Sequence, residues 1–597
     1  MTRATRKLQM HGVDALLTGA VTLAVAAPLL FTRSGFALDF TNHLWLVWAA
    51  GRALVESGHP SYFINTTTQG VFNPWFAFYG GTLYMTTGAI SELFGGHPVI
   101  AYVGVTVLAI AGAYAGTLWL GRQFGLRGWI AHAPALTVVT SAYYITNLYG
   151  RGAWAELIAA SSIPPLLASG VHLIRVPAWR PWPVLVFVVS AVFFTGSHNV
   201  TLLWGTTIAV IALLVLWISL GCPRRLPYRR LAMVAGLGLT ATLINSWFLV
   251  TDIAHAGDVK AHVAFSSSTV ASFTSMFDTP AVVLDPLRQV PARSTTPALY
   301  VQAPDWFLIW GLLAGLLLLG TRSTSRGLRR AWAAATIVVA LLLGMIMLKP
   351  FWEHLPKPFT QIQFPYRLDT FVVYAVAGLV LVGALALQRS ANERPQRATR
   401  PLLLALLVVI AVSFGLSQWQ EWVPTVSVLK NRAEALVSPN ILPRSWYDGG
   451  SYLDSSAPIV VAPPGRTLTI PPSQVQGDRF AAWMQVPAGR QPTQTNIAGG
   501  DYLVRIVGLE WLGRGPNGYA VVRRPNDGSG PVRVTVETAS SRAVKLGWAL
   551  SILAILGIVA VLIVTGARAR RATRSIPAEH SDTHPSGGHL PLARSRS

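Results

Sequence analysis

The sequence contains almost no cysteine and few charged side chains. Cys222 is the only cysteine among 597 residues, so an intrachain disulfide and a thiolate-based metal site are both excluded. We predict that this single thiol is buried and inert. Charged residues make up 12% of the chain and hydrophobic residues 52%. Soluble domains carry about 25% charged residues, so this composition excludes an ordinary soluble globular protein.

Several catalytic and binding patterns are absent as well. The sequence shows no P-loop, no dinucleotide glycine fingerprint, no nucleophile elbow and no metal-ligand spacing. The formal net charge of +23 would suggest nucleic acid as a partner of a soluble protein. Here the excess lies in short loops and tails, where the positive-inside rule and anionic lipid headgroups account for it. We therefore expect membrane lipids, and no nucleic acid, as partners.

What the sequence does contain is a series of apolar runs separated by short Arg-rich loops. The runs are about 20 residues long, which is the length of a transmembrane helix. Arg3, Arg6 and Lys7 place the N-terminus in the cytoplasm and mark a retained signal anchor. Under that assignment every Arg-dense loop falls inside, both termini are cytoplasmic and about twelve spans result. The expected spans are 12–32, 98–120, 129–148, 154–174, two halves of 182–220 broken at 196–199, 231–252, 306–322, 331–349, 370–388, 402–418 and 545–566.

The segments between the spans define the domain organisation. Residues 41–57 repeat apolar groups at helical spacing and 72–79 are rich in aromatic rings, so we expect both to lie in the membrane interface. Short β-prone runs alternate with Pro and Gly turns from 419 to 543, which predicts a small extracytoplasmic β sandwich. The expected parts are a transmembrane domain (1–418) with outer loops 33–97, 253–304 and 350–369, the β domain (419–543), a last span (544–566) and a disordered basic tail (567–597).

Polar residues that need an explanation fall on the outer face under this topology. The first group is Asp39 with His43, just before the interfacial helix. A carboxylate at the membrane boundary is suited to act as a general base toward a hydroxyl group, with His43 helping to position that group. The alternative is that Asp39 only caps the helix that follows, and the two roles are compatible.

The second group surrounds Tyr149, Arg151 and Glu156. A guanidinium at the outer end of a helix suits a phosphate group, and the glycines on both sides of Arg151 permit a close backbone approach. Glu156 lies about one turn inside the membrane edge, where an ionised carboxylate is costly unless it has a partner. The alternative is a structural Arg151–Glu156 pair that closes the helix end.

The third group occupies residues 361–369, again at an outer helix start. Arg367 is placed to hold a second phosphate oxygen, while Phe364 and Tyr366 are placed to line a groove beside Gln363. That groove would take a prenyl chain or a sugar ring. The alternative is an aromatic-belt anchor with a snorkelling arginine.

Two isolated residues complete the candidates. His198 interrupts a long apolar run, where a histidine serves either as a site residue or as a packing and helix–helix hydrogen-bonding residue. Trp75 lies in the aromatic segment 72–79 and is a candidate for the substrate groove.

Together these motifs resemble a protein family. The Asp-bearing first outer loop, the helix after it, the Arg-Gly-x-x-x-Glu stretch at 151–156 and the Gln-Phe-Pro-Tyr-Arg element at 363–367 resemble bacterial membrane proteins labelled "6-pyruvoyl-tetrahydropterin synthase-related". The label does not imply pterin chemistry, and the resemblance covers residues 10–420. That family is similar to the GT-C superfamily of integral membrane glycosyltransferases. The resemblance implies polyprenyl-phosphate-sugar donors and a C-terminal β-rich domain outside.

The GT-C pattern places a catalytic acidic residue in the first outer loop, which is Asp39 here. Many GT-C enzymes have two adjacent acidic residues there, whereas Asp39 is followed by Phe40. This departure favours a metal-free base mechanism and leaves a divalent cation open as the only cofactor.

The resemblance implies transfer of a sugar from a polyprenyl-phosphate-sugar to a cell-envelope glycan or glycolipid on the outer face of the cytoplasmic membrane. Extensive use of Arg and Ala indicates a GC-rich genome and makes arabinose or mannose the candidate sugar. A non-catalytic scaffold or a lipid-linked glycan transporter is the alternative, and the sequence does not indicate an oligomeric state. The candidate residues are Asp39, His43 and Glu156 for catalysis, Arg151 and Arg367 for the donor phosphate, and Trp75, Tyr149, His198, Gln363, Phe364 and Tyr366 for the groove.

Overall fold

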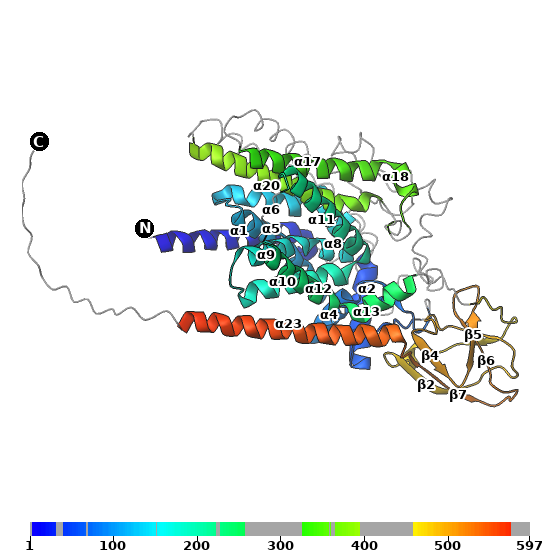
Figure 1. Ribbon diagram of the computed structural model, residues 1–597. Coiled ribbons are helices and arrows are strands. Elements are labelled where there is room, and N and C mark those ends of the chain that lie inside the picture. Colours follow the sequence, from blue (N-terminus) through cyan, green and yellow to red (C-terminus); the bar gives the residue numbers. More distant parts are fainter. Residues whose placement is uncertain are drawn as a thin grey trace, which may run out of the picture.

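The chain forms a bundle of long helices with a small sheet region at one end (Figure 1). The computed structural model describes residues 3–31, 40–66, 70–150, 152–222, 227–256, 325–356, 359, 365–393 and 458–574. The helical part contains α1 (Arg3–Phe31), α2 (Phe40–Ser57), α3 (Trp75–Phe78), α4 (Gly81–Leu93), α5 (Pro98–Gln123), η1 (Gly128–His132), α6 (Ala133–Thr140), α7 (Ala142–Ile145), η2 (Thr146–Gly150), α8 (Trp154–Ser161), α9 (Ile163–Arg175), α10 (Pro181–Ser197), α11 (Asn199–Ser219), α12 (Tyr228–Leu243), α13 (Ser246–His255), α17 (Arg326–Met347), α18 (Lys349–Glu353), η6 (Pro365–Leu368) and α20 (Asp369–Glu393). The last helix, α23 (Arg542–Arg574), follows the sheet region and runs back along the bundle.

Seven of the described helices are long and apolar enough to cross a membrane, and an eighth span results if the bent pair α12–α13 is counted as one. The protein is therefore a multi-pass helical membrane protein. The predicted break at 196–199 is confirmed, because α10 ends at Ser197 and α11 begins at Asn199. The predicted spans 306–322 and 402–418 lie outside the described residues, so the total of about twelve stays a prediction.

Two predicted spans differ in form from single helices. Residues 129–148 are divided among η1, α6, α7 and η2, because Ser141 takes an extended conformation (ψ 147°) between α6 and α7. The element η2 is a π-helix, a form that recurs at functional sites. Residues 231–252 bend by 78° between α12 and α13.

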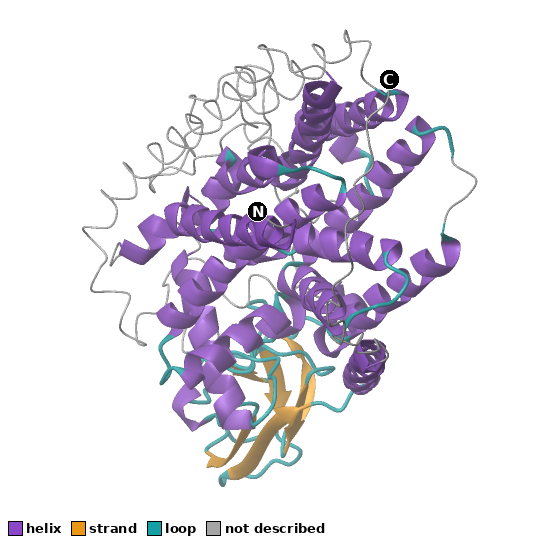
Figure 2. Ribbon diagram, turned by 90° about the vertical axis from the view of Figure 1, so that its left-hand side faces the viewer, coloured by secondary structure: helices purple, strands orange, loops and turns teal. Residues whose placement is uncertain are grey.

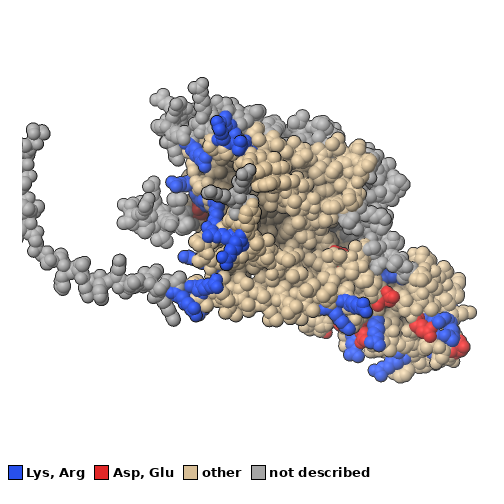
Figure 3. All heavy atoms as spheres, in the orientation of Figure 1, with Lys and Arg blue, Asp and Glu red and all other residues tan. Residues whose placement is uncertain are grey.

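The Arg-rich helix ends meet at the opposite end of the bundle. Arg230 Nη1 donates a hydrogen bond to Ile174 O at 3.0 Å, and Arg330 Nη1 donates to Leu220 O at 3.4 Å. Figure 3 shows Lys and Arg gathered at this end and on the sheet region, with almost none on the intervening surface. Such segregation is typical of a membrane protein whose basic loops share one side.

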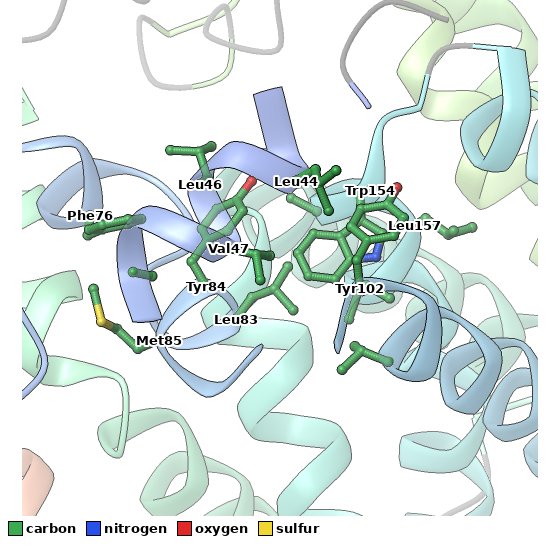
Figure 4. Close-up of a cluster of buried hydrophobic side chains, with 14 of the residues drawn as sticks. Leu44, Leu46, Val47, Phe76, Leu83, Tyr84, Met85, Tyr102, Trp154 and Leu157 are labelled. Atoms are coloured by element: carbon green, nitrogen blue, oxygen red, sulfur yellow. The ribbon is translucent and has the colours of Figure 1, made fainter. Parts of the chain in front are cut away.

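Helices α2 and α4 pack backbone against backbone through two glycines. A Cβ atom on Gly88 would lie 2.4 Å from Gly51 N, a distance that no real side chain tolerates. The helix predicted at 41–57 is confirmed as α2, whereas α4 was not predicted. Leu44 and Val47 of α2 pack in the same buried cluster as Tyr84 of α4 (Figure 4). The close approach fixes the position of α2 relative to the core.

The sheet region confirms a small C-terminal β-rich unit. Its described strands form two sheets, with the orders β1-β3-β6-β5 and β2-β7-β4. Buried residues of both sheets, such as Val522 and Val536, belong to one hydrophobic cluster, as in a sandwich. Figure 2 shows these strands beside the short helices at that end of the bundle. The strands are β1 (Thr467–Leu468), β2 (Arg479–Met484), β3 (Thr493–Thr495), β4 (Val504–Val507), β5 (Glu510–Arg514), β6 (Ala520–Arg523) and β7 (Val532–Thr538), with η7 (Pro472–Gln474) between β1 and β2.

Main-chain hydrogen bonds join the sheet region to the loop that follows α2. Val71 N donates to Asn496 O, and Ala498 N donates to Val71 O, each at 2.9 Å. Asn65 Nδ2 also donates to Gly477 O at 2.9 Å. The loop between α2 and α3 is therefore an extra strand-like edge of the sheet region, and the two parts of the protein are docked through it.

Two expectations require correction. Cys222 is exposed rather than buried, because it follows the last turn of α11 at the Arg-rich end, with a φ of 50°. The tail predicted to be disordered from 567 is helical as far as Arg574. Ala and Arg are strong helix formers, so a helix already nucleated by the span propagates into the basic segment. Residues 575–597 lie outside the described part of the chain.

Candidate active site

Glu156 is the centre of a buried polar cluster near the end of the bundle that carries the sheet region. It lies in the first turn of α8, and only 2% of its surface is exposed. Its Oε1 atom accepts hydrogen bonds from Tyr143 Oη (3.0 Å), Asn147 Nδ2 (3.3 Å) and Thr370 Oγ1 (3.0 Å). These donors come from α7, η2 and α20, so Glu156 ties three elements together. Asn147 lies in the π-helical element η2.

Arg367 lies against the other oxygen of the same carboxylate. The separation between Arg367 Nε and Glu156 Oε2 is 3.8 Å, and 12% of the arginine side chain is exposed. Arg367 Nη1 lies 3.4 Å from His198 Nε2. The guanidinium is thus held between a carboxylate and an imidazole, partly accessible from outside. Such a group is positioned to receive an anionic oxygen without first having to be ordered.

His198 is fixed by its place between α10 and α11. Its Nδ1 atom lies 2.7 Å from Thr201 Oγ1, and the imidazole caps the first turn of α11 by accepting from Thr201 N. The ring is 2% exposed. A histidine in the break between two apolar helices therefore caps one helix and contacts Arg367 through its other nitrogen.

Aromatic rings connect this cluster to His43. The ring of His198 meets that of Tyr79 edge-on, with centroids 5.6 Å apart, and Tyr79 lies 6.2 Å from Tyr84. Tyr84 Oη is 2.6 Å from His43 Nδ1. Tyr84 also lies 5.9 Å from Trp154, which is two residues before Glu156 on α8. His43, His198, Glu156 and Arg367 therefore belong to one contiguous network.

The other predicted site residues differ in whether the structure places them in this network. Trp75 joins the network, because its ring lies 6.0 Å from that of Tyr79. Tyr149 is buried, and its hydroxyl donates to Val25 O on α1, so its phenol braces α1; its predicted place in the groove stays a prediction. Tyr366 lies in η6 beside Arg367. Asp39, Arg151, Gln363 and Phe364 lie outside the described residues.

The expected Arg151–Glu156 pair therefore stays a prediction, and within the described residues the arginine beside Glu156 is Arg367. Sequence reasoning missed Tyr79, Tyr84, Asn147 and Thr370 as members of the network. In the sequence these four residues differ from many others only in being polar or aromatic near a predicted outer helix end. They can be identified only from the contacts that the folded chain makes between elements distant in sequence.

No group of three or more His, Cys, Asp or Glu side chains within the described ranges is arranged to hold a metal ion. Asp39 falls outside those ranges. The chemistry that the described residues support is recognition of an anion by Arg367 beside polarisable aromatic and imidazole rings.

Comparisons with known proteins bear on the whole chain. No protein-family model matches the sequence, and no curated protein matches it. Among solved structures, the arabinofuranosyltransferase AftD from Mycobacteria is 15% identical over 68% of this chain and 26% of that chain, with a TM-score of 0.42. ArnT from Cupriavidus metallidurans in the apo state is 13% identical over 70% of this chain and 76% of that chain, with a TM-score of 0.34.

ArnT from the same organism bound to undecaprenyl phosphate is 13% identical over 63% of this chain and 78% of that chain, with a TM-score of 0.27. The chain spans about a quarter of the length of the AftD chain that it matches (26%). All three TM-scores are below 0.5.

Proposed function

We propose that this protein is a membrane glycosyltransferase that moves a sugar from a polyprenyl-phosphate-sugar to a cell-envelope glycan or glycolipid. The observation that carries the proposal is the guanidinium of Arg367, held between Glu156 and His198 at the sheet-bearing end of the helical bundle. When a sugar leaves a prenyl phosphate, negative charge develops on the phosphate. A preorganised cation contributes most at the place where such charge develops.

Each candidate residue has a role in this proposal. Asp39 is the general base that deprotonates the acceptor hydroxyl, and His43, held by Tyr84, positions that hydroxyl. Arg151 and Arg367 bind the phosphate of the donor. Glu156 holds Arg367 and is a positioning residue, because its carboxylate is already engaged by three hydrogen-bond donors.

The groove for the donor would be lined by aromatic and polar residues around the network. Trp75 and His198 contact Tyr79, which supports placing them there. Gln363, Phe364 and Tyr366 precede or accompany Arg367 along the chain, so they would lie beside the prenyl chain or the sugar ring. Arabinose and mannose are the sugars to test first, and a divalent cation shared by Asp39 and the outer loops is to be tested with them.

The proposed orientation places the site and the sheet region outside the cytoplasmic membrane. The gathering of arginines at the opposite end of the helical bundle supports it, because basic loops face the cytoplasm. In that orientation the sheet region would bind the acceptor glycan or position the enzyme on it.

The test is transfer of radiolabelled sugar from a panel of polyprenyl-phosphate sugars by the purified full chain, with and without Mg²⁺ or Mn²⁺. Asp39→Asn should lower the rate about 10²-fold or more, because a general base is lost. Arg367→Gln should lower kcat/KM by about 10² through loss of charge stabilisation. The matched control is Arg326→Gln, which removes an exposed arginine at the Arg-rich end of the bundle, opposite the proposed site, and should leave the rate unchanged.

The outcomes separate the transferase from the alternatives. Absence of transfer from every donor, with folded protein and envelope extract as acceptor, would favour the scaffold or transporter. Equal rates for the wild type and Asp39→Asn would retain the transferase and remove Asp39 as the base. Equal rates for the wild type and Arg367→Gln would contradict the proposed role of Arg367 in binding the donor phosphate, on which the proposal depends.

A further inference from the structure

A second carboxylate lies beside the Arg367 network, on an element that the sequence analysis treated as the end of an ordinary span. Asp252 is near the C-terminus of α13, the helix that bends by 78° away from α12. Asn245, at the bend, donates to Val192 O (2.9 Å) and accepts from Thr82 Oγ1 (2.6 Å). Tyr62 Oη donates to Trp247 O at 2.6 Å. The bend is therefore built by specific contacts, and it directs α13 toward the start of α11.

The bend brings Asp252 to Asn199. Asn199 Nδ2 donates to Asp252 Oδ2 at 2.7 Å and to Phe78 O at 2.9 Å. Both partners are acceptors, so the orientation of the amide is determined by its contacts. The buried Oδ1 atom of Asn199 has no hydrogen-bond partner. A buried acceptor without a donor is costly in a protein interior, so the two Nδ2 contacts are what hold this amide between Asp252 and Phe78.

Asp252 and Asn199 are close to the proposed phosphate site along a short path. Asn199 directly follows His198, whose Nε2 atom lies 3.4 Å from Arg367 Nη1. Tyr79 directly follows Phe78, and its ring meets that of His198. Asp252, Asn199 and Tyr79 are all half-buried, so each has a surface that a ligand could contact. Asn199 and Tyr79 thus adjoin His198, which contacts the cation, and Asp252 contacts Asn199.

We propose that Asp252, Asn199 and Tyr79 form a subsite that binds the hydroxyl groups of the sugar being transferred. This inference rests on the proposed function. The sugar is attached directly to the phosphate, so a subsite for its hydroxyls must lie within one ring width of Arg367. A carboxylate accepts hydrogen bonds from two neighbouring hydroxyls, and the Asn199 amide, whose two hydrogens are donated to Asp252 Oδ2 and Phe78 O, holds that carboxylate in place. The ring of Tyr79 offers an apolar face to the C–H side of a sugar. A metal ion is a poorer fit, since no group of three ligating side chains is found within the described ranges.

The test compares binding of a ligand with the sugar and a ligand without it. Farnesyl-phosphoryl-arabinose, farnesyl-phosphoryl-mannose and farnesyl phosphate are titrated against the purified full chain. Asp252→Asn and Asn199→Ala should each weaken a sugar-bearing ligand about tenfold or more, as expected for the loss of hydrogen bonds to a charged or buried group. Farnesyl phosphate should bind within about twofold of wild type, because its phosphate contacts are retained. Arg367→Gln should weaken both kinds of ligand.

Two further variants guard against a trivial loss of folding. Tyr79→Leu removes the ring without touching the Asn199–Asp252 contact and should weaken only the sugar-bearing ligands. Asp501→Asn, at an exposed carboxylate of the sheet region, should change neither kind of ligand. Retained farnesyl phosphate binding in each variant shows that the fold and the phosphate site are intact.

Several results would overturn the subsite. Equal weakening of farnesyl phosphate and of the sugar-bearing ligands would mean that Asp252 and Asn199 only support the fold. Unchanged binding of all ligands by Asp252→Asn, Asn199→Ala and Tyr79→Leu would show that these residues do not contribute to the donor site. If the wild type binds sugar-bearing ligands selectively but transfers nothing, the transferase fails while the subsite stands. If the wild type binds neither kind of ligand, both proposals fail.

Discussion

Glu156 illustrates how a single buried charge is retained in an apolar bundle. An ionised carboxylate in such surroundings loses its hydration, and the loss must be offset by close partners. Three neutral donors contact one oxygen, and the guanidinium of Arg367 lies near the other. Removal of one charge of this pair would therefore leave the other buried without a countercharge. We therefore propose that Glu156 supports Arg367, and its predicted catalytic role stays a prediction.

Replacement of Glu156 tests this support. Glu156→Gln keeps the volume but removes the countercharge of Arg367, and we expect a loss of about 3 kcal/mol in unfolding free energy. Thermal unfolding in detergent measures the change. The control Glu510→Gln disrupts a half-exposed pair with Arg523 and should change stability by less than about 1 kcal/mol. A Glu156→Gln protein as stable as the wild type, yet inactive, would instead assign the carboxylate a chemical role.

At the scale of elements, the contact between α2 and α4 positions one side of the site. His43 is on α2 and Tyr84 is on α4, and their side chains are 2.6 Å apart. The two helices approach closely only because Gly51 faces Gly88. Small residues allow the same close approach between helices in membranes generally. The glycines thus set the distance across which the two aromatic side chains meet.

A methyl group at this contact should be enough to disturb the site. In Gly88→Ala the new Cβ would lie 2.4 Å from Gly51 N, so the helices must separate. We expect a stability loss of about 1–3 kcal/mol from overpacking, together with lower transfer activity. The matched control is Gly104→Ala on α5, where nothing lies within 4 Å of the added atom. A Gly88→Ala protein that matches the control in both unfolding temperature and activity would contradict this account of the contact.

At the scale of the whole molecule, the sheet region is docked on the helical bundle through main-chain pairing. Val71 pairs with Ile497 in a parallel bridge, and both residues are buried. The ring of Tyr502 also stacks on that of His255 at the end of α13, with centroids 3.6 Å apart. The loop just before Trp75 and the end of the helix that carries Asp252 are therefore both in contact with the sheet region. Its removal should disturb the site as well as any acceptor binding.

A pair of introduced cysteines can test the docking directly. In a Cys222→Ser background, Val71→Cys with Ile497→Cys should form a disulfide on mild oxidation, because paired residues on adjacent strands are within disulfide reach. A mobility shift reversed by reductant measures it. The control pair is Val71→Cys with Val507→Cys, the latter on β4 in the other sheet, and should not cross-link. Failure of the first pair while both thiols remain reactive would contradict the docking.

The exposed thiol offers a test of orientation. Cys222 lies at the Arg-rich end, which we place in the cytoplasm. A membrane-impermeant maleimide should therefore label the wild type only after the membrane is permeabilised. In the Cys222→Ser background, Asp501→Cys on the sheet region should be labelled in intact cells or spheroplasts. The reverse pattern would invert the topology and move the proposed site to the cytoplasmic face.

Much of the architecture follows from local sequence signals. Long apolar runs, the helix at 41–57, the break at 196–199 and the C-terminal strands were predictable because hydrophobic periodicity and turn residues are local properties. The kink between α12 and α13 was not, because contacts of Asn245 with distant Thr82 and Val192 hold it. Cys222 was misjudged because the exposure of a residue at a helix end depends on what packs beside it.

For the candidate site, the sequence by itself determined that His43, Glu156, His198 and Arg367 were unusual, since charged and imidazole groups are costly beside apolar runs. It could not determine that Arg367 lies beside Glu156, or that Tyr79 and Tyr84 link the two histidines. Only the tertiary structure decided these pairings and brought Asp252 to Asn199. The physical reason is that the free-energy cost of burying a polar side chain depends on its residue type, whereas the partner that offsets this cost comes from an element far away in the chain.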